Sequence, residues 1–293
     1  MYLASDVSRQ LSTSERLRLR ARMSELAKRA AERFRSAVRP IYGVKEHCLP
    51  NHIGSAVLLN IRGMKLLLTA AHVIDANKEM LTTLYVGGTE GRFVPIETEF
   101  RTTSKPNGDR NKDQYDFAIC RLSEEMIAQL GTGYITEGDI ATEVQAGHLY
   151  TAVGFPNSKN RWSNPITKKT VAKVLSYSST WRFSDQIAKR LEGQGEGEHH
   201  VFLGYKKHSR SEEGIKISSV NLRGLSGGAI FDAGRPSDLR VFREEIATVP
   251  RLIGITTQRW KEHQVLVGTR MSVILPTILE EFAAATTTLS CPT

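Results

Sequence analysis

Three segments of the sequence carry side chains that could together perform acyl transfer. Ser226 lies in "GLSGGAIF" (224–231), between glycines at the start of an apolar run. Glycine and serine are also common turn residues, so this stretch alone is equally consistent with a tight turn entering a strand. If the turn is tight, the backbone N–H groups of Gly224 and Ser226 converge on one point, as an oxyanion requires. Ser226 is therefore a candidate nucleophile, with two candidate oxyanion donors beside it.

A base and a residue to orient it are also present. His72 follows the apolar segment "KLLLTAA", where a strand is expected to end, and Asp116 opens the apolar run "FAICRL". Taken alone, His72 is typical of a structural histidine and Asp116 of a turn residue. Held beside His72, Asp116 would fix the Nδ1–H tautomer and stabilise the imidazolium. Asp113 is the alternative, but it lies in a charged loop with no strand directly behind it.

Together the three segments resemble the trypsin/chymotrypsin-like serine peptidases. The motif T-A-A-H occupies residues 69–72, the pattern Asp-aromatic-Ala-aliphatic residues 116–119, and G-x-S-G-G residues 224–228. The order His, Asp, Ser is that of chymotrypsin and differs from subtilisin and the α/β-hydrolases. The resemblance covers about residues 50–282. It implies a serine endopeptidase in which Ser226 attacks the scissile carbonyl and forms an acyl-enzyme, His72 moves the proton and Asp116 orients His72.

The sequence departs from the secreted digestive members of that family. Val73 stands where they have a cysteine, and Leu225 replaces the aspartate that receives the new N-terminal ammonium on zymogen cleavage. No Ile-Val-Gly-Gly start is present. The resemblance is therefore closer to the bacterial intracellular or HtrA-like branch, and no PDZ domain is expected because the chain ends soon after the second barrel. Leu225 also leaves an alternative open, in which a latent or inactive binding or regulatory module needs a partner to assemble its oxyanion hole.

The same resemblance places the specificity pocket beside the nucleophile and along a later strand. Val220 falls where trypsins carry the aspartate that selects Lys or Arg, and nothing acidic stands at that point. We therefore expect an apolar or small residue on the amino side of the cleaved bond. The expected lining consists of Val220, Leu222, Thr256, Thr257 and Gln258.

Short β-rich runs separated by turn signals fill the chain from about Gly43, which predicts an all-β sandwich or barrel. The resemblance implies two packed six-stranded antiparallel barrels with the site between them. We expect the first barrel over 41–145, the second with a C-terminal helix over 146–284, and a flexible tail over 285–293.

The first 40 residues form a separate basic leader. Residues 1–39 hold ten basic and four acidic residues, a net +6 of the chain's +9. Ser12 and Glu15 form a capping box ahead of apolar residues at helical spacing, and Pro40 is expected to end the helix. The favoured interpretation is a helix docked on the body or on a second copy. A contact to nucleic acid or a regulatory partner, and a targeting role, are the alternatives.

Composition and cysteine spacing argue against a membrane-spanning, secreted or metal-binding protein. No run approaches the roughly 18 apolar residues of a membrane span, and the start lacks a secretion signal. Cys48, Cys120 and Cys291 follow neither a metal spacing nor a disulfide framework, as is typical of a reducing cytoplasm. We therefore expect a cytoplasmic protein without a cofactor or metal that acts on protein or peptide substrates. The oligomeric state stays open.

Overall fold

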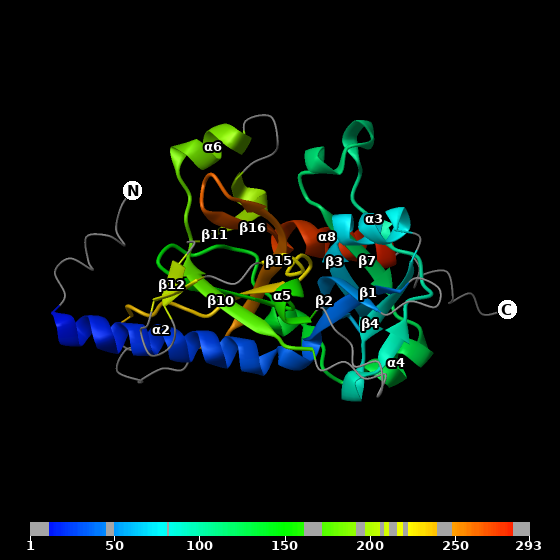
Figure 1. Cartoon of the computed structure of the whole chain (residues 1–293), viewed down its shortest axis with the longest axis horizontal. Coiled ribbons are helices and arrows are strands. Elements are labelled where there is room, and N and C mark those ends of the chain that lie inside the picture. The colour runs from blue at the N-terminus through cyan, green and yellow to red at the C-terminus, as the bar shows by residue number, and fades with distance from the viewer. Residues whose placement is uncertain are drawn as a thin grey trace.

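The structure is a computed structural model and describes residues 12–44, 50–80, 82–160, 172–191, 197–205, 208–210, 216–218, 222–238 and 248–283. Most of its strands belong to two curled, mainly antiparallel sheets that lie side by side (Figure 1). This arrangement confirms the predicted class of two packed β-barrels. Residues 285–293, expected to be a tail, lie outside the described residues.

The first sheet has eight strands in the order β5-β4-β1-β2-β3-β7-β6, with β8 paired to β2. Six were expected; β6 and β8 have only two residues each. The strands are β1 (Val38–Val44), β2 (Asn51–Ile61), β3 (Met64–Ala70), β4 (Thr83–Gly87), β5 (Phe93–Pro95), β6 (Arg101–Thr102), β7 (Phe117–Arg121) and β8 (Ile135–Thr136).

The second sheet has the expected six strands, in the order β10-β9-β14-β15-β16-β11. An isolated bridge between Trp181, which follows β10, and Leu203 of β11 joins its two edges. The strands are β9 (Leu149–Gly154), β10 (Leu175–Thr180), β11 (His200–Gly204), β14 (Ala229–Asp232), β15 (Arg251–Trp260) and β16 (Val265–Arg270). A separate hairpin pairs β12 (His208–Arg210) with β13 (Lys216–Ser218).

The apolar runs of the first sheet are continuous because both of its faces are buried. In β3, Leu66 and Leu68 point into the layer between the two sheets, whereas Leu67 points into the interior of the first barrel. In β7, Phe117 and Ile119 likewise face the layer between the sheets, and Ala118 and Cys120 the barrel interior. This alternation follows from the two-residue period of a strand. Burial raises the pKa of the Cys120 thiol to about 12, so it is protonated and inert at neutral pH.

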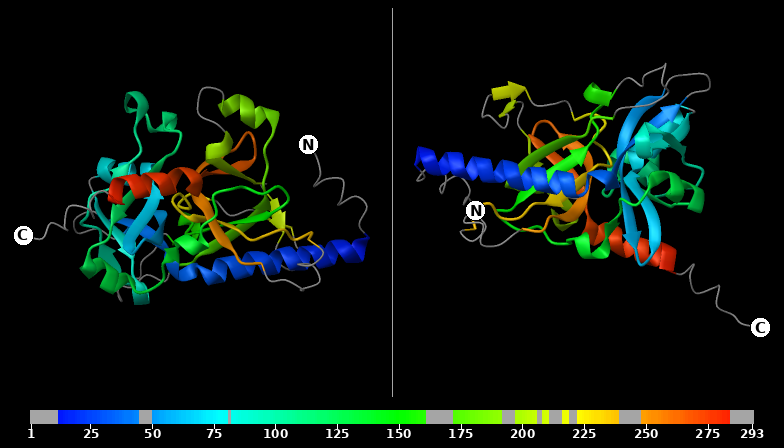
Figure 2. Two further views of the ribbon diagram at one scale, coloured as in Figure 1. Left: turned by 180° about the vertical axis from the view of Figure 1, so that it is seen from behind. Right: turned by 90° about the horizontal axis from the view of Figure 1, so that it is seen from below.

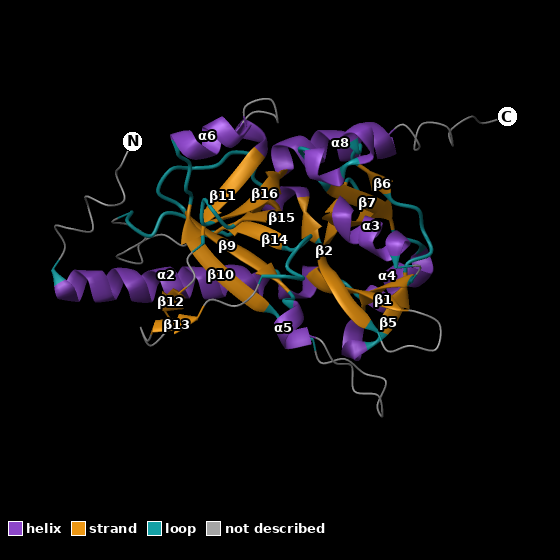
Figure 3. Ribbon diagram, turned by 45° about the horizontal axis from the view of Figure 1, so that its top comes forward, coloured by secondary structure: helices purple, strands orange, loops and turns teal. Residues whose placement is uncertain are grey.

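Helices cover the outside of the two sheets, as the coloured elements of Figure 3 show. Beside the N-terminal α2 (Thr13–Arg33) they are α3 (Ala71–Glu79), α4 (Glu124–Leu130), α5 (Asn157–Asn160), α6 (Asp185–Leu191) and α8 (Met271–Ala283). α2 and α8 approach the layer between the sheets from different sides (Figure 2). No described helix combines the length and the apolar character that crossing a membrane requires.

The N-terminal helix is capped as predicted but ends earlier. Ser12 and Glu15 form the reciprocal capping box, and Leu26 and Ala30 are buried against the body. The expected end at Pro40 is wrong: the helix ends at Arg33, and the ring of Phe34 stacks on Phe231 of β14 at 4.7 Å. Pro40 lies inside β1 opposite Ser55 of β2, whose N–H donates to Ser226 instead, and pairing with β4 begins only at residue 41. Its missing N–H therefore costs no ladder bond. The first sheet thus begins at residue 38, ahead of the expected boundary at 41.

Candidate active site

The pairing of β3 with β7 brings His72 and Asp116 together. Ala70 and Phe117 are partners at the end of this ladder, and the Ala71 N–H donates to the Asp116 carbonyl just beyond it. His72 is therefore the second residue of α3 and lies directly beside Asp116. His72 Nδ1 lies 2.7 Å from Asp116 Oδ2, and the His72 backbone N–H donates to Asp116 Oδ1 at 2.9 Å. The carboxylate thus fixes both the ring and the backbone of His72 and directs Nε2 away from itself.

Asp116 is held in an unusual backbone conformation by the second barrel. Its φ is +45°, a region that few residues other than glycine adopt, and only 2% of the residue is exposed. His200 Nε2 donates to the Gln114 carbonyl at 2.7 Å, and the Thr269 hydroxyl donates to the Tyr115 carbonyl. Two side chains of the second barrel therefore fix the backbone immediately before the carboxylate.

The alternative aspartate is engaged elsewhere. Asp113 Oδ2 accepts from Arg110 Nη1 at 2.5 Å and from the hydroxyl of Thr103. Arg110 in turn donates to Asp75 at 2.7 Å. Asp113 therefore belongs to an ion-pair network that stabilises its own loop, and only Asp116 contacts His72.

The loop that carries Ser226 is fixed against both barrels. The Ser55 N–H of β2 donates to the Ser226 carbonyl at 2.8 Å, and the Gly227 N–H donates to the Thr256 carbonyl of β15 at 2.7 Å. Gly227 has a φ of +81°, and a Cβ there would collide with Ser55 and Thr69. Only glycine fits this position. The nucleophile loop is thereby packed against the segment that leads into His72.

Ser226 and His72 thus lie on adjoining segments, and the His72 side chain is 37% exposed. Within the described residues no hydrogen bond joins the Ser226 hydroxyl to His72. Such bonds are often long in the absence of substrate and tighten when substrate binds.

The peptide between Arg223 and Gly224 is held in one orientation by its carbonyl. Residues 222–225 form a β-turn in which the Leu225 N–H donates to the Leu222 carbonyl at 2.9 Å. Gly224, the third residue of this turn, has a φ of +92°, as in a type II turn. The Arg223 carbonyl accepts from the Asn157 N–H at 2.7 Å. Because the N–H of a trans peptide points opposite to its carbonyl, the Gly224 N–H faces away from Asn157. Within the described residues neither this N–H nor that of Ser226 has an acceptor.

Two residues that sequence reasoning missed support this peptide. His52 Nδ1 lies 2.6 Å from Asn157 Oδ1, and His52 is 1% exposed. Burial lowers the pKa of His52 to about 4, so the ring is neutral at pH 7 and donates from Nδ1 to the amide oxygen. The only signal in the sequence was a histidine just before "GSAVLL" and an asparagine just after "VGFP".

Leu225 is an apolar anchor for the loop. It is 1% exposed and lies in the core of the second barrel, where its side chain packs against Gly154 and Leu222. The Thr256 hydroxyl donates to the Leu225 carbonyl. Apolar burial therefore fixes the residue before Ser226, where the sequence has no aspartate that could form an ion pair.

The expected specificity residues have varied surroundings. Val220 lies outside the described residues. Leu222 is buried in the core of the second barrel, and the Thr256 hydroxyl donates to the Leu225 carbonyl in the Ser226 loop. Thr257 is 6% exposed, at a register shift of β15, and Gln258 accepts from the Trp260 indole at 2.9 Å.

Comparison with known proteins finds a matching family model and many similar solved structures. The family model described as Trypsin matches residues 46–265. Among solved structures, a scabies mite inactivated protease paralogue, S-I1, superposes with a TM-score of 0.55 at 13% sequence identity, over 86% of this chain and 96% of that chain. No curated protein matches the chain in sequence.

Proposed function

The chain belongs to the trypsin family, and on that premise we propose that it is a serine endopeptidase that cleaves peptide bonds through Ser226, His72 and Asp116. The proposal rests on one observation above the others, the Arg223 carbonyl held by the Asn157 N–H at 2.7 Å. This bond holds the Gly224 N–H on the opposite side of the peptide from Asn157, and it supports a role for that N–H as an oxyanion donor.

The reaction follows from the roles of these groups. His72 Nε2 accepts the hydroxyl proton of Ser226 while the oxygen attacks the scissile carbonyl. The imidazolium that forms is stabilised by Asp116, whose carboxylate lies 2.7 Å from Nδ1. The tetrahedral oxyanion accepts from the N–H groups of Gly224 and Ser226. His72 then gives its proton to the leaving amine, and water hydrolyses the acyl-enzyme by the same steps.

Labelling with a fluorophosphonate probe tests the nucleophile directly. We expect the wild-type chain to react once, at Ser226, and the Ser226→Ala and His72→Ala variants to lose both labelling and peptide cleavage. Ser184→Ala is a matched control because Ser184 is an exposed residue that precedes α6, and within the described residues it bonds only to Ile187 and Ala188 of that helix. Labelling that persists in Ser226→Ala would exclude this mechanism.

A second candidate function is a peptidase-fold binding or regulatory module. Two observations favour it: the Ser226 hydroxyl makes no hydrogen bond to His72 within the described residues, and the similar scabies mite protein is an inactivated paralogue. This candidate expects a folded wild-type chain that neither reacts with the probe nor cleaves peptides until a partner is added. Labelling of the purified chain alone would decide for the enzyme.

We further propose that the enzyme prefers apolar or small residues before the cleaved bond. The absence of an acidic residue at Val220 supports this preference. A peptide library that shows cleavage mainly after Lys or Arg would contradict it.

A further inference from the structure

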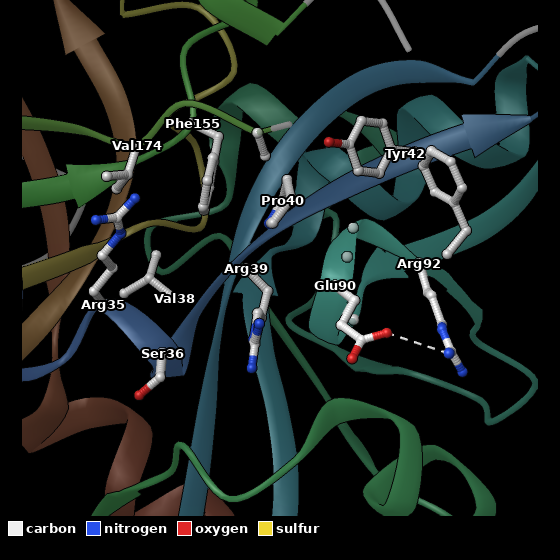
Figure 4. A pocket seen from close by; sticks show the side chains of 15 residues that line it. Arg35, Ser36, Val38, Arg39, Pro40, Tyr42, Glu90, Arg92, Phe155 and Val174 are labelled. Atoms are coloured by element: carbon white, nitrogen blue, oxygen red, sulfur yellow. Dashed lines mark hydrogen bonds and ion pairs between the residues drawn. The ribbon is translucent and has the colours of Figure 1, made fainter. Parts of the chain in front are cut away.

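A pocket of about 540 Å³ lies outside the candidate active site, between the end of the N-terminal helix, β1 and the turn that precedes β5 (Figure 4). Its wall combines arginines with aromatic and apolar side chains. The residues discussed below are Arg35, Arg39, Arg92, Tyr42 and Phe155. Val38, Pro40 and Val174 add apolar surface. Such a combination is typical of sites that hold a ligand body by burial and orient it with a few polar groups.

The charge of this wall is positive and incompletely compensated. Arg92 pairs with Glu90 at 3.3 Å, but Arg35 and Arg39 contact no carboxylate within the described residues. Arg39 Nη2 donates to the Leu130 carbonyl at 2.8 Å, whereas its Nε is buried and has no hydrogen-bond partner in the described part of the chain. Because Arg35 and Arg39 have no carboxylate partner there, a bound anion would supply the missing counter-charge.

The pocket also shares its wall with the support of the oxyanion peptide. The Tyr42 ring lies edge-on to His52, with centroids 5.5 Å apart, and His52 holds Asn157. On the other side, the Phe155 N–H donates to Ser55 Oγ at 2.9 Å, and the same hydroxyl donates to the Gly224 carbonyl at 2.9 Å. Two short chains of contacts therefore run from the pocket to both sides of Gly224.

We propose that this pocket is an effector site for a small ligand that joins an anionic carboxylate or phosphate group to an apolar or aromatic body. The anion contacts Arg35 and Arg39, and the body packs on Tyr42 and Phe155. Occupancy then stabilises the orientation of the Arg223–Gly224 peptide and raises the turnover of the proposed peptidase. The effect on turnover rests on the proposed function, whereas the binding site does not.

Binding is measured with 8-anilinonaphthalene-1-sulfonate, a fluorescent probe with an anionic head and an aromatic body. We expect one probe per chain, and about tenfold weaker binding in the Arg35→Gln/Arg39→Gln double variant, since a charge-assisted hydrogen bond is lost. Arg35 is exposed and Arg39 half-buried, and glutamine can still donate to the Leu130 carbonyl, so the variant should fold. Arg121→Gln, an exposed arginine on β7, is the matched control and should bind as the wild type. Equal binding by all three proteins, or no saturable binding, overturns the proposal.

Competing ligands show whether the pocket binds a carboxylate on an alkyl body or a phosphate on an aromatic body. Displacement of the probe by sodium decanoate identifies an alkyl carboxylate, and displacement by AMP identifies an aromatic phosphate; either result agrees with the proposal. Displacement by neither compound overturns it.

Hydrogen exchange of residues 222–228 measures whether ligand binding in the pocket stabilises the Ser226 loop, and this measurement needs no activity. We expect the displacing compound to slow exchange in this segment in the wild type and to leave it unchanged in the double variant. Peptide cleavage with and without the same compound then measures the effect on turnover. Binding without slower exchange overturns the effector role. Slower exchange in a chain that never cleaves peptides leaves the effector site standing and counts against the proposed function alone.

Discussion

The backbone N–H of Asn157 donates to the carbonyl of Arg223 at 2.7 Å, and this bond sets the direction of the next peptide N–H. The Asn157 side chain is held by the neutral ring of His52 at 2.6 Å. In family members with an aspartate before the nucleophile, an ion pair with the new N-terminus supports the same loop. Here a buried leucine and a hydrogen-bonded asparagine take that place, so we expect the loop to need no proteolytic activation.

Replacing Gly224 by alanine should remove most of the turnover. A Cβ at this position would collide with Asn157 Oδ1 and lie 2.8 Å from His52 Cε1. The peptide must move, and loss of one oxyanion donor lowers kcat by about 100- to 1,000-fold. Gly63→Ala is the matched control: Gly63 has a similar φ of +82° but nothing within 4 Å of its Cβ position. Steady-state cleavage of a peptide substrate measures both, and equal losses would show that backbone strain alone is responsible.

Asn157→Ala should lower kcat by about tenfold. The variant keeps the backbone N–H that bonds Arg223 but loses the side-chain contact with His52 that positions it, so the Gly224 N–H is misplaced. A misplaced oxyanion donor weakens binding of the transition state more than that of the substrate. KM should change little. The control is Asn111→Ala, which removes an exposed amide bonded only to Asp109. A rise in KM at unchanged kcat would place Asn157 in substrate binding instead.

Asp116→Asn should reduce kcat by about four orders of magnitude, since the amide no longer selects the reactive tautomer of His72. Asp113→Asn serves for comparison: Asp113 is also buried but pairs with Arg110 rather than with His72. Its activity per folded molecule should stay near that of the wild type. Similar losses in the two variants would contradict the assignment of Asp116.

Leu225→Asp should destabilise the fold by several kcal/mol, because it buries a carboxylate without a partner. Leu17→Asp is the control: Leu17 is 59% exposed on the N-terminal helix, so the change there should fall within about 0.5 kcal/mol. Urea unfolding followed by circular dichroism measures both. A stable Leu225→Asp protein would show that the loop does not depend on apolar burial.

The stability of the fold should depend on pH through His52. In the unfolded chain its pKa returns to about 6.5, whereas burial keeps it at about 4 in the folded chain. Between these values only the unfolded chain binds the proton, so the free energy of unfolding falls as pH drops from 6.5 to 4, by about 3 kcal/mol in total.

Urea unfolding of the wild type and of His52→Gln at pH 7, 5 and 4 isolates this contribution, because the other titrating groups are common to both proteins. The variant should be less stable at pH 7, since it loses the ring that bonds Asn157. The gap should narrow on acidification. A gap that stays constant over this range would mean that His52 does not titrate as described.

The sequence alone determined the class of fold and the three residues of the candidate site. Short apolar runs, alternating or continuous, are typical of half-buried or fully buried strands, and His72, Asp116 and Ser226 stand where such runs begin or end. These are local properties, set by residue type and spacing along the chain. The same local rules failed at Pro40, which looked like a helix stop: packing of Phe34 on Phe231 ends the helix earlier, and the register of β1 accommodates the proline.

The tertiary structure alone decided which residues orient the peptide between Arg223 and Gly224. His52, Ser55 and Asn157 are distant from residue 224 in sequence and meet it only where the two barrels pack together. The direction of a peptide depends on which donor its carbonyl finds, and here that donor comes from another segment of the fold. No pattern within "GLSGGAIF" carries that information, because the bond that fixes its Gly224 N–H is made by Asn157.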